Sequence, residues 1–531
     1  MRLPNTTIGA ELIAAGKDVQ LDADVVVIGS GCGGATVAML AAQAGRSVIV
    51  LEQGGLYSRE DLDQRELHSL AKIDGARGIE SSANQSVMLS FGNNVGGASV
   101  HYWADSYRTP PDRLKLWEER FGLTGHTEQD LAPLFDRIEA EHHVQPAEDR
   151  YVNRMNALLR DAGLAMGWAV ERVPQARRGC ASSGYCHQGC SYDAKQSQLV
   201  TSIPAALQAG ARLYADCRAS VARWTGPRVD RVVAQVLDRA TGRPSGLKVE
   251  VNCKALVVAA GGYGTPTFLL AQGLRERLPH LGEHLFVNPC PMTHALFDED
   301  ITQWRNIPAS WALTEFRAAR HSADPSAPPT GFFGAQGRYV EGGYLLMANQ
   351  LQPALLAAAL PGGGAAHRAL MRQANRLGGL ISWIDDAEDG RVSWDGAQRR
   401  VNVPLDGGNE LRIRDAWKKQ ATLLLRAGAR EVMFGDLPDT RVQRADQIEQ
   451  AVAGITLRPG RNLFAAPHPG GAARMGADPL HGVVGFDHRV LGTDNLFVAD
   501  SSVFPTGPSV DPSLTIMAFS HVAARHLLQS V

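Results

Sequence analysis

Residues 24–52 read DVVVIGSGCGGATVAMLAAQAGRSVIVLE, and this stretch decides the fold. It predicts a strand over 24–28, a helix over 35–44 and a second strand over 47–51. The β-branched run in the first strand suits a strand that is buried on both faces of a parallel sheet. A glycine-rich turn joins this strand to the helix, as in the strand–turn–helix–strand units of doubly wound folds. We therefore expect an α/β fold.

The turn carries Gly29, Gly31 and Gly34 in the spacing G-x-G-x-x-G, and Glu52 follows the second strand. Glycines at these positions allow a tight turn and let the backbone approach a pyrophosphate at the helix N-terminus. An acidic residue at this distance can accept hydrogen bonds from ribose hydroxyls. The unit predicts a site for an ADP group, and on its own it fits NAD and FAD equally.

Composition excludes several classes of protein. The 531 residues include 53 Lys and Arg against 55 Asp and Glu, with a formal net charge of −2, so we expect no nucleic-acid partner. No run reaches about 18 apolar residues, so we expect no transmembrane segment, although peripheral membrane association is compatible with the sequence. The N-terminus lacks a signal-type apolar region, and the seven cysteines fit a reduced compartment, which together predict a cytoplasmic protein.

Further glycine-rich segments lie at both ends of the chain. They occupy residues 91–103, 255–270 and 468–476, and a turn-rich stretch follows at 495–518. With the first unit, these ordered motifs resemble the glucose-methanol-choline (GMC) oxidoreductase family, which binds FAD. The similarity is greatest to the bacterial branch that oxidises long-chain, terpene and sterol alcohols.

The resemblance implies a fold of two discontinuous domains. A Rossmann-like FAD-binding domain would comprise residues 1–110, 195–295 and 456–531. An inserted α+β substrate-binding domain, an antiparallel sheet flanked by helices, would comprise 111–194 and 296–455. From the residues themselves, alternation over 229–258 predicts two antiparallel strands, and the pattern over 411–427 predicts an amphipathic helix.

The resemblance also implies which residues contact FAD. The expected contacts are Gly29, Gly31, Gly34 and Glu52 at the ADP half, Val221 at the adenine, Gly96, Gly97 and Ser99 beside the pyrophosphate and flavin, Gly261 in the 260–266 segment, Asp500 and Ser501 at the ribityl-pyrophosphate, and Pro512 and Thr515 near the isoalloxazine.

His468 and Asp511 are the expected catalytic residues. Oxidation of an alcohol needs a base for the hydroxyl proton, and histidine suits this role near neutral pH. His468 begins the H-x-x-G-x-x-R-M-G segment that places the family's active-site histidine. Asp511 departs from the family, which has His or Asn there. It could share a proton with His468, hold His468 charged, act as the base, or cap the helix that follows.

His101 and a cysteine cluster leave alternatives open. His101 occupies the place where some family members attach the flavin covalently, and a non-covalent neighbour or a packing residue are the alternatives. Cys180, Cys186 and Cys190 have a spacing that three-thiolate iron–sulfur sites also use, and zinc with His187 is a further alternative. We expect no metal here.

The substrate region is rich in aromatic residues, which favours an apolar or cyclic alcohol over a free sugar. These residues are Trp304, Trp311, Phe316, Phe332, Phe333, Tyr339, Tyr344 and Trp383. Residues 351–365 could form a lid or a surface-seeking helix.

We expect hydride transfer from an alcohol carbon to flavin N5, with a quinone, a protein or oxygen as the final acceptor and a dehydrogenase favoured over an oxidase. A flavin-dependent desaturase of a cyclic or terpenoid substrate and a lyase with structural FAD are the alternatives.

Overall fold

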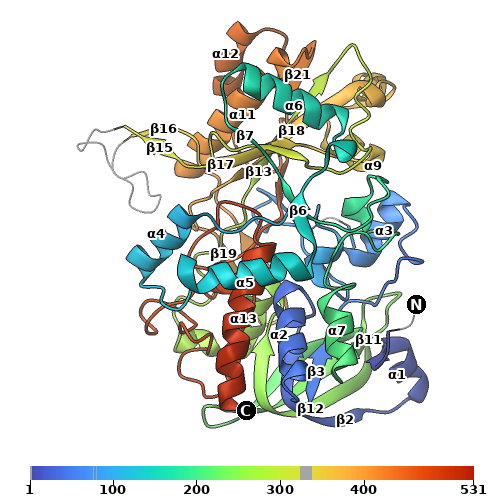
Figure 1. The fold of residues 1–531 in the computed structure, drawn as a ribbon, viewed down its shortest axis with the longest axis vertical. Coiled ribbons are helices and arrows are strands. Elements are labelled where there is room, and N and C mark those ends of the chain that lie inside the picture. Colours follow the sequence, from blue (N-terminus) through green and yellow to red (C-terminus); the bar gives the residue numbers. More distant parts are fainter. Residues whose placement is uncertain (1–2, 76, 79, 323–337) are drawn as a thin grey trace.

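The computed structural model describes residues 3–75, 77–78, 80–322 and 338–531, and it contains two packed sheets with helices around them (Figure 1). Parallel pairing predominates in the first sheet and antiparallel pairing in the second, so the expected α/β class is confirmed. The thirteen helices of the described residues are α1 (Gly9–Ala15), α2 (Cys32–Gln43), α3 (Glu66–Ile73), α4 (Pro111–Phe121), α5 (Glu128–Glu141), α6 (Arg154–Ala165), α7 (Ser202–Gln208), α8 (Gly261–Ala271), α9 (Pro353–Ala359), α10 (Gly364–Met371), α11 (Gly408–Arg426), α12 (Ile448–Gly454) and α13 (Ser513–Ser530).

The first sheet forms the lower layer of Figure 1. Its order is β1 (Thr6–Thr7), β9 (Arg212–Tyr214), β3 (Val48–Leu51), β2 (Val19–Ile28), β12 (Pro244–Val258), β11 (Arg228–Leu237) and β10 (Cys217–Thr225), and β24 (Leu496–Val498) also pairs with β12. The pairs from β1 to β12 are parallel, and so is the pair of β12 with β24. Strands β10, β11 and β12 are antiparallel, which confirms the two strands predicted over 229–258.

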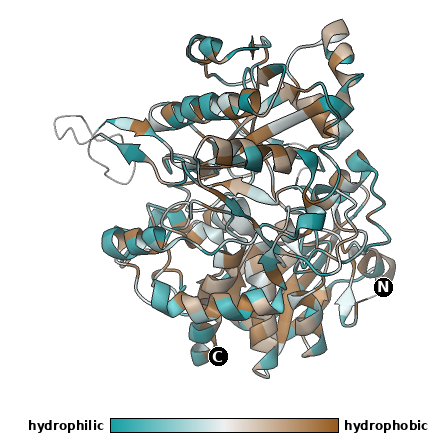
Figure 2. Ribbon diagram, turned by 45° about the horizontal axis from the view of Figure 1, so that its top comes forward, coloured by the Kyte–Doolittle hydropathy of each residue, from teal (hydrophilic) through white to brown (hydrophobic). Residues whose placement is uncertain are grey.

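Strand β2 is buried on both faces, as its β-branched run predicted. Val25 and Val27 pack in the core that α2, α7 and α13 cover. Val26 and Ile28 pack in a second core with residues of β10, β11 and α8. In Figure 2 hydrophobic residues gather on the interior strands and helices of this layer, and hydrophilic residues mark its outer helices. This burial fixes the turn after β2 at the carboxyl edge of the sheet, where doubly wound folds bind ligands.

The second sheet forms the upper layer. Its order is β4 (Glu80–Ser81), β5 (Met88–Leu89), β23 (Phe464–Ala466), β13 (Cys290–Leu296), β18 (Leu377–Ile384), β17 (Tyr344–Ala348), β14 (Trp311–Leu313) and β7 (Val170–Arg172), and β21 (Glu431–Phe434) pairs with β13 and with β22 (Arg441–Val442). Helix α11 covers one face of this sheet: Gln420 bonds to Thr293 at 3.0 Å, and Trp417 Nε1 donates to the Met292 carbonyl at 3.2 Å. This helix matches the amphipathic segment predicted over 411–427. The opposite face of β13, which carries Met292, is turned away from α11.

Several segments that were assigned to one predicted domain pack against, or pair with, the sheet of the other. Helices α4 and α5, which were expected in the substrate-binding domain, bury Trp117 and Phe135 in the core of the first sheet beside α13. Strands β4 and β5, which were expected in the FAD-binding domain, join the second sheet. The hairpin of β19 (Arg391–Trp394) and β20 (Arg399–Asn402) packs on α8. Within the described residues, no helix is both long and apolar enough to cross a membrane.

Three short two-stranded pieces complete the fold. They are β6 (Val144–Pro146) with β8 (Pro174–Ala176), β15 (Arg320–His321) with β16 (Tyr339–Glu341), and the hairpin β19–β20. Residues 351–365, the predicted lid, contain α9 and the start of α10. Glu66 of α3 accepts the Ala354 and Leu355 N–H groups at 2.8 and 2.6 Å, and Leu356 is buried. This segment is therefore anchored to the body of the protein at the N-terminus of α9.

Candidate active site

A cavity of about 660 Å³ runs along the carboxyl edge of the first sheet and reaches into the second layer. Its lining begins at Glu52 and at residues 217–220, passes the turn 29–33, and ends at His468. Of the expected cofactor contacts, the residues that line it are Gly29, Gly31, Glu52, Gly97, Gly261, Asp500, Ser501 and Pro512. One continuous cavity thus joins the predicted nucleotide site to the predicted base.

The turn after β2 has two kinds of glycine. A Cβ on Gly33 would lie 1.6 Å from the Ala499 carbonyl oxygen, and one on Gly34 would lie 2.0 Å from the Gly29 carbonyl oxygen, so these positions admit no side chain. A Cβ on Gly31 would meet only Gly97 Cα, at 3.9 Å. Gly31 is also the N-cap of α2, with no side chain bonded to the cap. The free N–H groups of this helix end, next to an open space, fit a pyrophosphate group.

Glu52 is held in a fixed orientation at the edge of the cavity. Its Oε2 accepts from the Ser30 N–H and hydroxyl at 2.9 and 2.7 Å, and its Oε1 accepts from the Gly54 N–H at 2.8 Å. Burial raises the pKa of this carboxyl above its usual value, and these donors oppose the shift. A carboxylate oriented in this way can accept further hydrogen bonds from ribose hydroxyls, which agrees with its expected role.

Asp500 organises the turn on the other side of the cavity. Its Oδ2 accepts from the Gly261 N–H at 2.9 Å and from the Thr265 hydroxyl at 2.5 Å, and its Oδ1 accepts from the Ser502 N–H at 2.9 Å. Ser501, in turn, donates its hydroxyl to the Pro469 carbonyl at 2.6 Å. Asp500 and Ser501 therefore tie the start of α8 to the segment that contains His468.

The lining also includes residues that the sequence did not predict, and it omits some that were expected. Hairpin β19–β20 contributes Trp394, Gln398 and Arg399, and no local motif marks these residues. The expected contacts outside the lining are Gly34, Gly96, Ser99, His101, Val221 and Thr515. Val221 pairs with Val233 between β10 and β11, whereas its neighbours Ala219 and Ser220 line the cavity.

Two of these outer residues support the cavity from behind. Ser99 donates its hydroxyl to the Gly96 carbonyl at 2.6 Å and accepts the Gln198 N–H at 2.9 Å. Thr515 and Thr109 share a hydrogen bond of 2.6 Å between their hydroxyls. Both residues are buried, so they fix the loops around the cavity.

His468 and Asp511 form a pair beside the end of the cavity. The His468 Nε2 lies 3.2 Å from Asp511 Oδ1, and their side chains are 12% and 11% exposed. His468 Nδ1 and Asp511 Oδ2 are buried and have no hydrogen-bond partner in the part of the chain that the structure describes. Helix α13 begins at Ser513, and its N-cap, Pro512, receives no side-chain bond. The helix-cap alternative for Asp511 gains no support from the described residues, in which its carboxylate is paired with His468.

A second carboxyl group, Asp105, lies in the same region and was missed by the sequence reasoning. Its Oδ1 accepts from Gln175 Nε2, while its Oδ2 is buried without a partner. Burial, and then the negative charge of Asp511, raise the pKa of Asp105 well above its usual value. The one available signal was its position shortly after the 96–101 loop.

An apolar wall adjoins the pair on the face of the second sheet that is turned away from α11. The Trp383 ring meets the His468 ring edge to face at 5.4 Å and the Trp103 ring at 5.8 Å. The wall consists of Val173, Cys290, Met292, Ala309, Ala312, Leu345, Met347, Ile381 and Trp383, with Trp103, Tyr107 and Ala465 packed against it. The nine residues of the wall are buried and none of them lines the cavity, so the structure describes an apolar core directly beside His468.

Most of the other aromatic residues predicted for the substrate region lie elsewhere. Phe316 and Tyr344 are core residues above the sheet, and Trp304 packs near α9. The Trp311 ring lies under the Arg172 guanidinium at 4.6 Å. Tyr339 bonds to Asp415, and Phe332 and Phe333 lie outside the described residues. Only Trp383, among the predicted aromatic residues that the structure describes, contacts His468.

His101, at the end of the 96–101 loop, and Cys186 are buried, whereas Cys180 and Cys190 are partly exposed. The His101 ring meets the His187 ring at 5.6 Å, and burial lowers the pKa of His101 well below its usual value. Lys195 donates to the carbonyls of Val100, Tyr102 and Cys186 at 2.6 to 2.8 Å, which ties the loop to the cysteine segment.

The three cysteines have separate surroundings. The Sγ of Cys186 accepts from Arg177 Nη1 at 3.3 Å, and that of Cys180 accepts from the Ser182 N–H at 3.4 Å. Across the described ranges, no three His, Cys, Asp or Glu side chains are grouped so that they could hold a metal ion. The iron–sulfur and zinc alternatives thus gain no geometric support.

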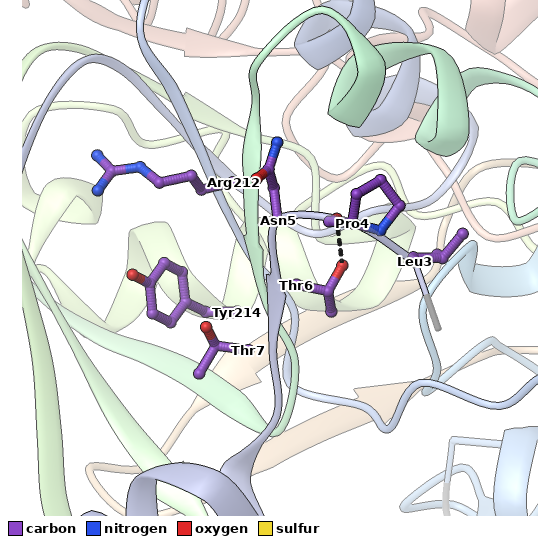
Figure 3. Close-up of a pocket in the computed structure, with 7 residues that line it drawn as sticks. All are labelled: Leu3, Pro4, Asn5, Thr6, Thr7, Arg212 and Tyr214. Atoms are coloured by element: carbon purple, nitrogen blue, oxygen red, sulfur yellow. Dashed lines mark hydrogen bonds between the residues drawn. The ribbon is translucent and has the colours of Figure 1, made fainter. Parts of the chain in front are cut away.

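A second pocket, of about 410 Å³, lies at the outer edge of the first sheet (Figure 3). Residues 3–7 and Arg212 and Tyr214 of β9 line it, and Thr6 donates its hydroxyl to the Pro4 carbonyl at 3.2 Å. It shares no residue with the larger cavity and holds none of the predicted site residues. The predicted site residues that line either of these two cavities therefore all lie in the larger one.

Comparison with known proteins agrees with this geometry. The GMC oxidoreductase family model matches residues 23–290 with its N-terminal part and 386–520 with its C-terminal part. An uncharacterised GMC-type oxidoreductase of Mycobacterium tuberculosis is 31% identical over 517 residues, which are 96% of this chain and 76% of that protein. A long-chain-alcohol oxidase of Arabidopsis thaliana is 23% identical over 538 residues, covering 97% of this chain and 69% of its own.

Among solved structures, pyridoxine 4-oxidase from Mesorbium loti has the same fold, with a TM-score of 0.68 and 17% identity over 95% of this chain and 99% of its own. The two family matches span most of the cavity lining described above. The chain belongs to the GMC oxidoreductase family of FAD-binding enzymes.

Proposed function

We propose that this protein oxidises the CH–OH group of an apolar or cyclic alcohol. The observation that carries the proposal is the His468–Asp511 pair, which lies between the end of the cofactor cavity and the apolar wall. When bound, FAD supplies the hydride acceptor at its N5 atom. The residues Gly31, Glu52, Gly97, Gly261 and Ser501 would hold it through the contacts described above.

His468 takes the hydroxyl proton in this proposal. A carboxylate can only accept, so the contact with Asp511 requires a hydrogen on Nε2 of His468. The neutral tautomer with this hydrogen leaves the lone pair on Nδ1, which is buried and has no hydrogen-bond partner among the described residues. Asp511 also stabilises the imidazolium that proton uptake creates, because it holds an opposite charge 3.2 Å from Nε2.

The apolar wall determines the class of alcohol. Trp383 stands beside His468, so a substrate whose hydroxyl reaches His468 places its carbon skeleton against Trp383 and the neighbouring wall residues. A free sugar would leave its other hydroxyls without partners on this surface, at a cost of about 1–3 kcal/mol for each buried group. The long-chain-alcohol oxidases of Arabidopsis thaliana, which bear their substrate class in their name, support an apolar alcohol.

An anaerobic screen of the purified yellow protein tests this function. Long-chain, terpene and sterol alcohols, a free sugar and a saturated cyclic ketone are mixed separately with the enzyme, and the flavin absorbance is followed. We expect bleaching by at least one apolar alcohol and by neither the sugar nor the ketone. Bleaching by the ketone alone would favour a desaturase, and no bleaching by any alcohol would favour a lyase.

Admission of air after bleaching identifies the acceptor. The dehydrogenase preferred from the sequence predicts slow return of the yellow colour in air and fast return with a soluble quinone. Similar proteins named as oxidases support oxygen instead. Rapid return of the colour with formation of peroxide would assign an oxidase.

A further inference from the structure

His468 and Asp511 come from separate segments of the chain, and a pair of adjacent buried carboxylates braces both segments. We propose that Asp385 and Asp386, which directly follow β18, are positioning residues that set the separation of His468 and Asp511. This inference rests on the proposed function and adds a role for two residues outside the substrate and cofactor contacts. Both are 3% exposed.

Asp386 binds residues 287 and 288, which lie next to the segment that contains His468. Its two carboxylate oxygens accept the Val287 and Asn288 N–H groups, at 2.9 and 3.1 Å. The Val287 carbonyl accepts the His468 N–H at 3.3 Å, and Phe286 and Gly470 exchange two backbone hydrogen bonds of 3.0 Å. Residues 286–288 thus form a segment that is hydrogen-bonded to Asp386 on one side and to the His468 segment on the other, and a shift of residues 286–288 would move the His468 backbone.

Asp385 binds Ser509, which lies in the turn that leads to Asp511. Its Oδ2 accepts from the Ser509 hydroxyl at 2.9 Å and from Arg113, and Arg113 also reaches Ser509. Ser509 has a φ of +62°, a left-handed conformation that a non-glycine residue keeps only when its surroundings hold it. Asp511 follows two residues later, so the bond from Asp385 fixes the turn that aims its carboxylate at His468.

The Arg113 guanidinium makes further hydrogen bonds to the 506–511 turn. Its Nη1 donates to the Thr506 hydroxyl at 3.2 Å, and Trp117 donates to the same oxygen at 2.7 Å. A Cβ on Gly507 would lie 3.2 Å from Asp385 Oδ1, so the turn itself passes next to the carboxylate. Helix α4 and the 506–511 turn are therefore joined to the end of β18 by one buried network.

The same strand end also carries the substrate wall. Trp383, two residues before Asp385, contacts the His468 ring, and the Asn288 side chain donates to the Ile384 carbonyl at 2.7 Å. A substrate that displaced β18 at Trp383 would therefore also move Asp385 and Asp386, and with them the segments that carry Asp511 and His468. A role of this kind affects the rate of the chemical step more than the binding of alcohol, because neither aspartate lies at the substrate.

Ionisation of Asp386 gives a separate readout. Burial raises its pKa to about 7, and the Val287 and Asn288 N–H groups oppose this shift. The titratable and charged groups that face it are Asp385 and Glu388 on its own loop, Tyr263 of α8, Cys290 of β13 and Arg412 of α11. Protonation of Asp386 weakens its hold on residues 286–288, so activity should fall as the pH drops below about 7.

The experiment compares Asp385→Asn and Asp386→Asn with wild-type holoenzyme and with Asp415→Asn as the matched control. Asp415 also accepts a backbone N–H, that of Gly342 at 3.0 Å, and its other partners in the described part of the chain are the hydroxyls of Tyr339 and Tyr344, which lie outside the His468 segment. Crystal structures and steady-state kinetics with the best alcohol of the screen are measured for each. In both brace variants we expect the His468 Nε2–Asp511 Oδ1 separation to exceed hydrogen-bond distance and kcat to fall about tenfold, the effect of losing one hydrogen bond, with little change in KM.

The control should keep both the separation and kcat. We also expect Asp386→Asn to show a smaller fall in activity below about pH 7 than wild type, because it lacks the ionisable carboxyl. An unchanged His468–Asp511 separation in both brace variants would overturn the proposal, whatever the kinetics. A lengthened separation in a protein that oxidises no alcohol would leave the brace intact and refute the proposed function instead.

Discussion

The two kinds of glycine in the turn after β2 predict opposite outcomes for two similar substitutions. In Gly33→Ala the new Cβ would lie 1.6 Å from the Ala499 carbonyl oxygen, a backbone atom that cannot move aside. We expect this variant to lose at least about 2–4 kcal/mol of stability, in the range of other overpacked or strained cores. In Gly31→Ala the new Cβ has only Gly97 Cα nearby, at 3.9 Å, so the apoprotein should be as stable as the wild type.

In Gly31→Ala the new methyl group would instead occupy the side of the turn that faces the cofactor cavity. Loss of one charge-assisted hydrogen bond between the α2 N-terminus and a phosphate costs about 1.5–3 kcal/mol, so the Kd for FAD should rise about 10- to 150-fold. Thermal unfolding of the apoproteins and fluorescence titration with FAD measure the two effects. The interpretation of this turn would be refuted if Gly31→Ala bound FAD as well as wild type, or if it destabilised the apoprotein as much as Gly33→Ala.

Three further predictions concern the residues around the catalytic pair. Trp383→Ala removes the ring beside His468. Because this loses about 1–2 kcal/mol of apolar contact, KM for an apolar alcohol should rise about tenfold, which steady-state kinetics measure. The pKa of Asp105 is higher in the folded protein than in the unfolded chain. The contribution of this difference to the free energy of unfolding is therefore fully present below about pH 4, and it is lost as the pH rises toward the folded-state pKa. Asp105→Asn should therefore become more stable relative to wild type between pH 5 and pH 8 in urea unfolding, and a constant difference would contradict this. His101 packs against His187 and does not line the cavity, so acid precipitation should release all flavin to the supernatant; yellow colour that stays in the pellet would show a covalent link.

Local patterns in the sequence predicted the elements that form from contiguous residues. The first strand, its glycine turn and α2 follow from burial on both faces and from the close approaches of Gly33 and Gly34. The antiparallel strands β11 and β12 and the amphipathic helix α11 follow in the same way from their periodicity. Each of these signals is carried within a short window of sequence, which is why it could be read without the tertiary structure.

The parts that could not be predicted depend on contacts between distant segments. Helices α4 and α5 are amphipathic, and nothing in their pattern says which sheet their apolar faces cover. For Asp511 the resemblance predicted a role beside His468 and left a cap role open, and the distance between the two side chains comes from the fold. Asp105 is ordinary in sequence, and its raised pKa arises from burial and from Asp511.

The most direct test of the account is the rate at which an apolar alcohol reduces the flavin in a single anaerobic turnover, compared between wild type and His468→Ala. A general base contributes about 10²- to 10⁴-fold, so the account predicts a loss of at least about 100-fold in this rate, with FAD still bound and alcohol still binding. A rate in His468→Ala within a few fold of wild type would contradict the assignment of His468 as the base.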